Sequence, residues 1–260
     1  MTDPAGQKER TRVCKACGKR ISWAARFCPA CGARHVSLAE RRARTRREAG
    51  RWRLVKGCIV FYMIYLASIV PLFWAPEEHL ATGMLVVSLV DAALVIVYWR
   101  TSGFQFRPMV VMSRPAVKWT AIALAALPAM LAVNYVYHSR LLELFGVDAP
   151  GIADPFELAG YAFWVVVLAV CVMPAVWEEI AFRGLVQGRL SQAVGEREAL
   201  VMTAVLFAII HRSAISAPYL LALGLVLGAL RRRSGSLVPG MVLHFLHNLG
   251  VVVFERWISV

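Results

Sequence analysis

Three short patterns of polar residues interrupt apolar segments in the C-terminal half of the chain. They are Glu178-Glu179-x-x-x-Arg183, Phe207-x-x-x-His211 and His244-x-x-x-Asn248. A charged side chain at membrane depth costs at least about 2 to 3 kcal/mol, so such residues usually serve a function. Carboxylates, an arginine, histidines and an amide held together in a bilayer would suit a buried catalytic site.

The first pattern should give its two neighbouring carboxylates different roles. On a helix, Glu179 and Arg183 are four residues apart with the acid on the N-terminal side, which favours an ion pair. Glu178 is rotated by about 100° and has no obvious local partner. Glu178 is therefore the candidate general base. The structural alternative is an interfacial salt-bridge cluster at a helix end.

The other two patterns could complete this site. His211 follows an apolar helix, and Phe207 lies one turn before it on the same face. His244 and Asn248 share one face of the last apolar segment, and His247 could join that face. Each of these residues could instead lie at the membrane interface or form hydrogen bonds between helices.

Taken together, these residues could hydrolyse an amide bond without a nucleophilic side chain. An unpaired carboxylate can activate water, a histidine can assist it, and further donors can stabilise an oxyanion. Two histidines and a glutamate could also form a metal site like those of hydrolytic zinc enzymes. The spacing does not decide between the two.

Four cysteines near the N-terminus form two matching C-x-x-C-G knuckles, which are Cys14-Lys-Ala-Cys17-Gly and Cys28-Pro-Ala-Cys31-Gly. Four thiolates suit a closed, tetrahedral, structural Zn²⁺ site. A redox role would need only one such pair. We therefore predict a zinc ribbon whose partner is unknown.

Charge divides the chain into a basic arm and a nearly neutral remainder. The 260 residues are 59% hydrophobic with a net charge of +13, and residues 1–56 hold 16 Lys/Arg against 4 Asp/Glu. We predict a zinc ribbon at 1–36, a polybasic juxtamembrane linker at 37–56 and a transmembrane domain at 57–260. The linker should bind anionic lipid headgroups. Nonspecific nucleic-acid binding is a less favoured alternative.

Apolar runs predict an all-α, polytopic transmembrane helix bundle with about seven spans. The expected spans are 57–75, 81–99, 119–137, 156–176, 198–212, 216–230 and 237–255. Basic residues then gather in inner loops at 100–118, 177–197 and 231–236, as the positive-inside rule requires for a cytoplasmic N-terminus. We expect a multi-pass protein of the cell membrane, with its C-terminus outside.

The ordered patterns resemble the CPBP family, which includes the type II CAAX prenyl endopeptidases and bacterial abortive-infection-like membrane proteins. The resemblance covers about residues 155–250. It implies that Glu178 and His211 activate water, that His244 and Asn248 stabilise the oxyanion, and that Glu179 and Arg183 support the site. It also favours glutamate-dependent hydrolysis without a catalytic metal.

The resulting hypothesis is an intramembrane endopeptidase acting on a membrane protein or peptide. The zinc ribbon, the basic arm and the short chain set it apart from eukaryotic prenyl proteases, so a prenylated substrate is not assumed. The alternative is a non-catalytic scaffold or bacteriocin-immunity-type protein that uses the same polar residues for helix packing.

Overall fold

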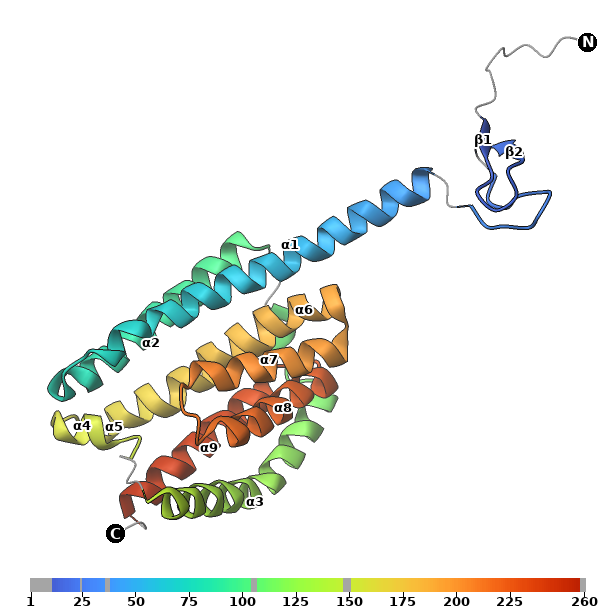
Figure 1. Cartoon of the computed structure of the whole chain (residues 1–260). Coiled ribbons are helices and arrows are strands. Elements are labelled where there is room, and N and C mark those ends of the chain that lie inside the picture. The colour runs from blue at the N-terminus through green and yellow to red at the C-terminus, as the bar shows by residue number, and fades with distance from the viewer. Residues whose placement is uncertain (1–10, 24, 36–37, 104–106, 147–150, 258–260) are drawn as a thin grey trace, which may run out of the picture. The chain divides into compact units, whose positions relative to one another are not determined.

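The computed structural model describes residues 11–23, 25–35, 38–103, 107–146 and 151–257. The chain divides into two compact units, Met1–Arg53 and Leu54–Val260. The first contains two short strands and the second is helical (Figure 1). Each unit is described by itself.

The N-terminal unit is built around its cysteines. Strands β1 (Thr11–Val13) and β2 (Arg20–Ser22) pair antiparallel, and the first knuckle connects them. Gly18 and Gly32 follow the two knuckles with φ of +74° and +70°, a conformation that glycine adopts without steric cost. Their amides donate to the carbonyl groups of the first cysteine in each knuckle, over 2.8 and 2.9 Å. The two backbone turns therefore bring the four cysteine thiols close to one another.

The helices follow one another with short connections. In chain order they are α1 (Leu38–Ser68), η1 (Val70–Phe73), α2 (Glu77–Thr101), η2 (Arg107–Val110), α3 (Arg114–Phe145), α4 (Asp154–Leu158), α5 (Phe163–Val166), η3 (Val167–Val172), η4 (Pro174–Val186), α6 (Gln187–Val194), α7 (Glu196–Ile210), α8 (Ala217–Ser234) and α9 (Val238–Trp257). The residues predicted to form a polybasic linker lie in the first half of α1 from Leu38 onward.

Five helices in the described part of the chain are long and apolar enough to cross a membrane. They are Ala39–Phe73, Glu77–Thr101, Arg114–Phe145, Phe163–Val194 and Val238–Trp257. The predicted count of about seven spans is not confirmed. The predicted spans at 198–212 and 216–230 correspond to α7 and α8, which have 15 and 18 residues, fewer than the roughly 20 needed to cross hydrocarbon.

The fourth of these segments corrects the predicted inner loop at 177–197. Helical structure continues through Phe163–Val194, and residues Glu179–Val186 are all buried. The prediction failed because it treated the charged residues as the end of a span. In the structure they neutralise each other inside the bundle, so the helix can continue past them. Much of this segment is a π-helix, a rare form that often occurs at functional sites.

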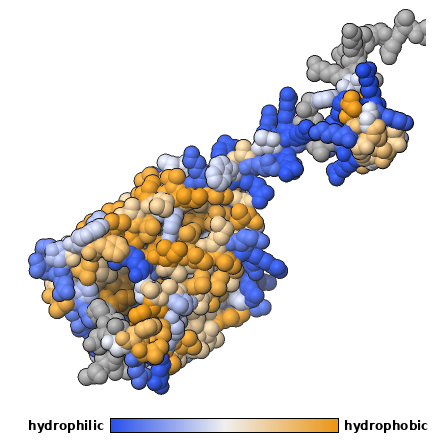
Figure 2. Space-filling view, in the orientation of Figure 1, coloured by the Kyte–Doolittle hydropathy of each residue, from blue (hydrophilic) through white to orange (hydrophobic). Residues whose placement is uncertain are grey.

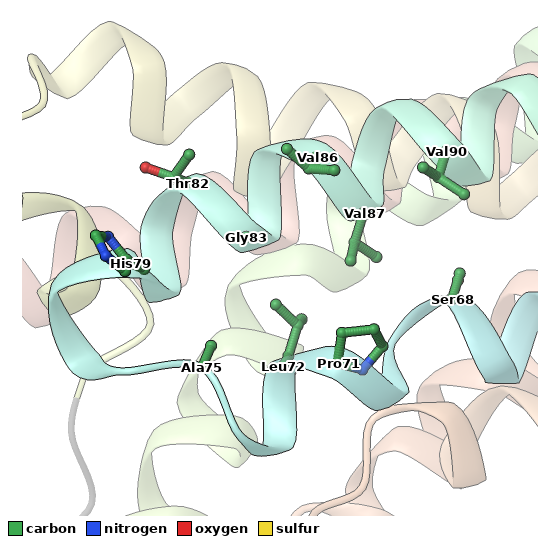
Figure 3. Close-up of a pocket in the computed structure, with 10 residues that line it drawn as sticks. All are labelled: Ser68, Pro71, Leu72, Ala75, His79, Thr82, Gly83, Val86, Val87 and Val90. Carbon is green, nitrogen blue, oxygen red and sulfur yellow. The ribbon is translucent and has the colours of Figure 1, made fainter.

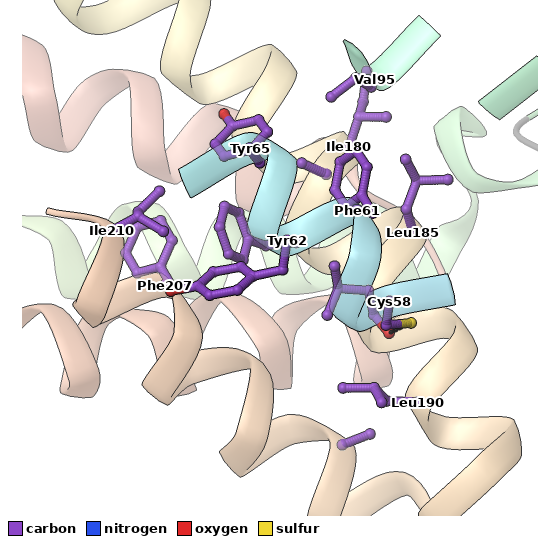
Figure 4. Packing of buried hydrophobic residues seen from close by; sticks show 14 of the residues in the cluster. Cys58, Phe61, Tyr62, Tyr65, Val95, Ile180, Leu185, Leu190, Phe207 and Ile210 are labelled. Atoms are coloured by element: carbon purple, nitrogen blue, oxygen red, sulfur yellow. Dashed lines mark hydrogen bonds between the residues drawn. The ribbon is translucent and has the colours of Figure 1, made fainter. Parts of the chain in front are cut away.

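Packing in the helical domain centres on this fourth segment. α1, α2, η4 and α7 contribute the largest buried cluster, which includes Tyr62, Tyr65, Phe182 and Phe207 (Figure 4). Tyr62 donates from its hydroxyl to the Leu206 carbonyl oxygen over 3.1 Å. α7 packs on α8, and α3 packs on both α8 and α9. The short helices α7 and α8 are therefore held within the bundle.

The outer surface of the helical domain is largely apolar. Figure 2 shows a mostly hydrophobic face with hydrophilic residues gathered toward the helix ends. Large side chains such as Leu89, Val97 and Trp164 are 65%, 59% and 68% exposed. Such an extended apolar surface would be unfavourable in water. The all-α bundle is thus a membrane domain, as the composition predicts.

Candidate active site

The first pattern contributes an ion pair in the interior of the bundle. Arg183 Nη1 donates to Glu179 Oε1 over 2.9 Å, and both residues are 0% exposed. The predicted pairing at four-residue spacing is therefore present. A buried charge must be paired to be tolerated, so each residue requires the other.

Arg183 also connects this pattern to the second one. Its guanidinium carbon lies 4.2 Å from the centre of the Phe207 ring, and Nη2 donates to the Gly224 carbonyl oxygen over 3.4 Å. One turn later along each helix, Gln187 donates to the Gly228 carbonyl oxygen over 3.0 Å. The two glycines of α8 present bare backbone to η4 and α6, and a Cβ on Gly224 would lie 3.1 Å from Ala204. Small residues at this spacing allow close helix approach in membranes.

His244 joins the third pattern to the first. Its Nδ1 lies 3.2 Å from Glu179 Oε1 in a site where His244 is 2% exposed. Because a carboxylate only accepts, His244 donates from Nδ1, and its Nε2 remains for other partners. Gly240, one turn earlier in α9, leaves space for Glu179, because a Cβ there would lie 2.7 Å from Oε2.

Glu178 lies beside this ion pair but is not part of it. Arg183 and His244 are close enough to interact with it electrostatically. Its Oε2 is buried and has no hydrogen-bond partner among the described residues. An unpartnered buried carboxylate oxygen is costly, and this is the atom that a water or substrate group could satisfy.

His211 is held at the C-terminal end of α7. Nδ1 lies 2.8 Å from the Phe207 carbonyl oxygen, and its ring packs against the Phe207 ring with centroids 4.7 Å apart. A carbonyl accepts only, so His211 donates from Nδ1 and its Nε2 has the free lone pair. Such a tautomer can accept a proton from water.

Phe207 is the residue that brings the three patterns together. It is 0% exposed, and it contacts the rings of Phe182, His211 and His244 at centroid distances of 5.5, 4.7 and 5.9 Å. The sequence contained this residue within the second pattern, but only as a neighbour of His211. The structure therefore places Arg183, His211 and His244 around one aromatic ring, and Glu179 contacts two of them, Arg183 and His244.

Asn248 lies at the far side of this group, one turn beyond His244. Its Nδ2 donates to the Val170 carbonyl oxygen over 2.9 Å. Its Oδ1 lies 3.5 Å from Nδ1 of the buried His247. The amide is thus fixed between η3 and α9, and His247 supports it rather than sharing a face with His244.

A second buried polar group was not predicted from the sequence. Asp91 in α2 is 8% exposed and accepts a hydrogen bond from Ser68 Oγ over 2.6 Å. Tyr65 also interacts with Asp91, and its ring meets Phe182 edge-on at 5.8 Å. A lone aspartate within the apolar run 81–99 was the available signal for this group.

Two apolar cavities flank the bundle. One of about 410 Å³ lies between the α1–α2 connection and α2, lined by residues that include Ser68, Leu72, His79 and Val90 (Figure 3). The other, of about 290 Å³, lies between the fourth segment and α9 and includes Ala175, Met241 and Phe245. The second cavity is lined in part by α9 residues that lie close to His244 in the sequence.

The N-terminal cysteines form a group that could hold a metal ion. The Sγ atoms of Cys14, Cys17, Cys28 and Cys31 all lie within 4.8 Å of one another. A thiolate is the form in which cysteine binds a metal ion. This arrangement fits the predicted structural site, in which four thiolates would surround one Zn²⁺.

A comparison with protein families matches residues 160–250 to the family described as Type II CAAX prenyl endopeptidase Rce1-like. This segment contains all three patterns. Residues 160–250 are therefore similar to this family. The match confirms the predicted resemblance and covers α5, η3, η4, α6 to α8 and α9 as far as Gly250. Comparisons with curated proteins and with solved structures gave no match. The Rce1-like family implies a membrane protease.

Proposed function

We propose that this protein is an intramembrane endopeptidase that cleaves a membrane-associated protein or peptide with water activated by Glu178 and His211. The observation that carries the proposal is the free Oε2 of Glu178 beside a neutralised Glu179–Arg183 pair. Arg183 and His244 both contact Oε1 of Glu179, whose Oε2 also has no hydrogen-bond partner among the described residues. Because Glu179 is held in this ion pair, Glu178 is the carboxylate available for proton transfer.

In the proposed reaction, water attacks the carbonyl carbon of the scissile bond and gives a proton to Glu178, with Nε2 of His211 as a second acceptor for the water. The carbonyl oxygen becomes an oxyanion. Asn248 through its second amide hydrogen would donate to it, and so would His244 through Nε2–H once its ring carries both protons, with Glu179 as the acceptor at Nδ1. The C–N bond then breaks as Glu178 returns its proton to the leaving nitrogen. This route needs no metal at the membrane site.

Purified full-length protein tests this mechanism with quenched fluorescent peptides carrying a C-terminal Cys-aliphatic-aliphatic-X sequence, with and without a farnesyl group. We expect cleavage by the wild type and loss in Glu178→Gln. Glu143→Gln, at an exposed ion pair with Arg140, is the matched control. Equal cleavage by wild type and Glu178→Gln would contradict the mechanism. Cleavage of only one peptide form would identify the substrate class.

We further propose that the first half of α1 contacts anionic lipid on the cytoplasmic side of the cell membrane. Arg41, Arg42, Arg46 and Arg47 are exposed on this helix, and each basic residue near an anionic surface contributes about 1 kcal/mol. Replacing these four arginines with glutamine should abolish binding of residues 1–53 to phosphatidylserine vesicles. Retained binding would contradict this role. The partner of the zinc ribbon is a separate question.

A further inference from the structure

A polar chain from α8 to η3 passes through Asn248 and is not used by the reaction described above. Tyr219 Oη lies 2.6 Å from His247 Nε2, His247 Nδ1 lies 3.5 Å from Asn248 Oδ1, and Asn248 Nδ2 donates to Val170 O over 2.9 Å. We propose that Tyr219 and His247 are positioning residues that orient the Asn248 amide toward the oxyanion. This inference rests on the proposed function of Asn248.

The Nδ2 atom of the Asn248 side chain is held by the fourth membrane segment, Phe163–Val194. Pro174 lies four residues after Val170 and has no N–H, so the α-helical hydrogen bond to Val170 O cannot form. The segment is π-helical here, and Asn248 supplies a donor to the Val170 carbonyl oxygen from another helix. Because a carbonyl oxygen only accepts, the atom facing Val170 must be nitrogen, and the amide oxygen must face His247.

The protonation of His247 follows from this orientation. Asn248 Oδ1 can only accept, so His247 must donate from Nδ1. In a neutral imidazole the other nitrogen, Nε2, is then an acceptor, and it receives the Tyr219 hydroxyl hydrogen over 2.6 Å. The chain of donors therefore runs in one direction, from Tyr219 to His247 to Asn248 to Val170.

One competing acceptor lies near the start of this chain. Tyr219 Oη is also 3.2 Å from the Met130 carbonyl oxygen in α3, and a hydroxyl has only one hydrogen. The shorter contact to His247 takes this hydrogen. Donation to Met130 instead would force His247 to donate from Nε2 and would remove the hydrogen bond to Asn248. The two arrangements therefore differ in the tautomer of one buried histidine.

The purpose of this orientation is to free one donor. Asn248 Nδ2 has two hydrogens, and in the part of the chain that the structure describes only Val170 O accepts from it. Fixing the amide at Oδ1 and at one hydrogen points the other hydrogen in a constant direction. Oxyanion donors are effective because their orientation is set before the reaction.

A purely structural role for Tyr219 is the competing explanation, since its ring stacks on His247 at 5.7 Å. Tyr219→Phe keeps this ring and removes only the hydroxyl. Tyr137→Phe is the matched control, because Tyr137 is also half-buried and its hydroxyl donates between helices to Ile215 O over 2.7 Å. Its ring stacks on Tyr219 at 6.2 Å, a contact that Tyr137→Phe keeps, and its hydroxyl forms no hydrogen bond to His247 among the described residues.

The first measurement is independent of activity. In full-length, ¹⁵N-histidine-labelled protein in detergent micelles, with His247→Gln used for assignment, we expect His247 as the Nδ1–H tautomer. Tyr219→Phe should keep this tautomer but move the Nε2 resonance to that of a ring nitrogen that accepts no hydrogen bond, and Tyr137→Phe should leave that resonance unchanged. An Nε2–H tautomer in the wild type, or an unchanged Nε2 resonance in Tyr219→Phe, would overturn the proposal even if no peptide is cleaved.

The second measurement uses the peptide cleavage assay. Tyr219→Phe should lower kcat roughly tenfold, as expected for one lost hydrogen bond, with KM unchanged. Asn248→Ala should lower kcat by about 10²- to 10³-fold, and adding Tyr219→Phe to it should cause no further loss. A further tenfold loss in the double variant would show that Tyr219 acts elsewhere. If Glu178→Gln retains full cleavage, the proposed function fails, whereas the tautomer result still stands.

Discussion

The central carbon of the Arg183 guanidinium lies over the Phe207 ring, 4.2 Å from its centre. One face of that ring thus meets a cation of the first pattern, and its neighbours His211 and His244 belong to the second and third. An aromatic ring attracts a cation by about 2 kcal/mol or more when desolvated. This contact is where three separate sequence patterns become one site.

Replacing Arg183 should destabilise the bundle rather than merely slow the reaction. Arg183→Leu leaves Glu179 as an unpaired buried carboxylate, and breaking such a pair costs about 3 to 5 kcal/mol. Thermal unfolding in detergent should show a clearly lower Tm. Arg140→Leu, which breaks an exposed pair with Glu143, should change Tm little. A normal Tm for Arg183→Leu would show that Glu179 is not ionised.

Gly240 should be required for the position of Glu179. A Cβ at Gly240 would lie 2.7 Å from Glu179 Oε2, whereas a Cβ at Gly184 would meet its nearest atom, on Leu237, at 3.6 Å. We expect Gly240→Ala to lower cleavage strongly and Gly184→Ala to preserve it. Similar activity in the two variants would mean that displacing the Glu179 carboxylate does not affect cleavage.

Removing the proposed general base should affect the chemical step. General acid–base catalysis contributes about 10²- to 10⁴-fold, so Glu178→Gln should lower kcat by that factor with little change in KM. Glutamine keeps the shape and hydrogen bonding of the side chain, so folding should be preserved. A raised KM with normal kcat would indicate a role in substrate binding instead.

Metal removal should distinguish the role of the N-terminal cysteine site from that of the membrane site. Chelation, or Cys14→Ser with Cys31→Ser, should remove one Zn²⁺ per chain, measured by elemental analysis. Cleavage of a short peptide should persist because the membrane site uses Glu178 and histidines alone. Loss of cleavage in the chelated protein, with activity retained in the cysteine variant, would reveal a catalytic metal in the membrane core.

Local spacing predicted the contacts that depend on one helix. The Glu179–Arg183 pair and the contact between the Phe207 and His211 rings follow from four-residue intervals. The family match likewise confirms a resemblance based on short motifs. The catalytic roles of Glu178, His211, His244 and Asn248 stay predictions.

Contacts between helices could not be derived in the same way. Treating charge as a sign of the membrane surface misplaced residues 177–197, since the partners that neutralise Glu179 include a histidine 65 positions away. Asp91 and Tyr219 were missed for the same reason. A single polar residue in an apolar run shows that a partner exists, but the sequence does not show which helix supplies it.

The π-helical form of the fourth segment also limits how this site can change. A π-helix closes its hydrogen bonds at i+5 and so fits more residues into each turn than an α-helix. Deleting one residue between Pro174 and Val186 would let the segment rewind to α-helical pitch and rotate everything beyond the deletion about the axis. Depending on which residue is deleted, Glu178 would rotate away from His244, or Arg183 would rotate away from Phe207. Length in this segment is therefore as constrained as residue identity.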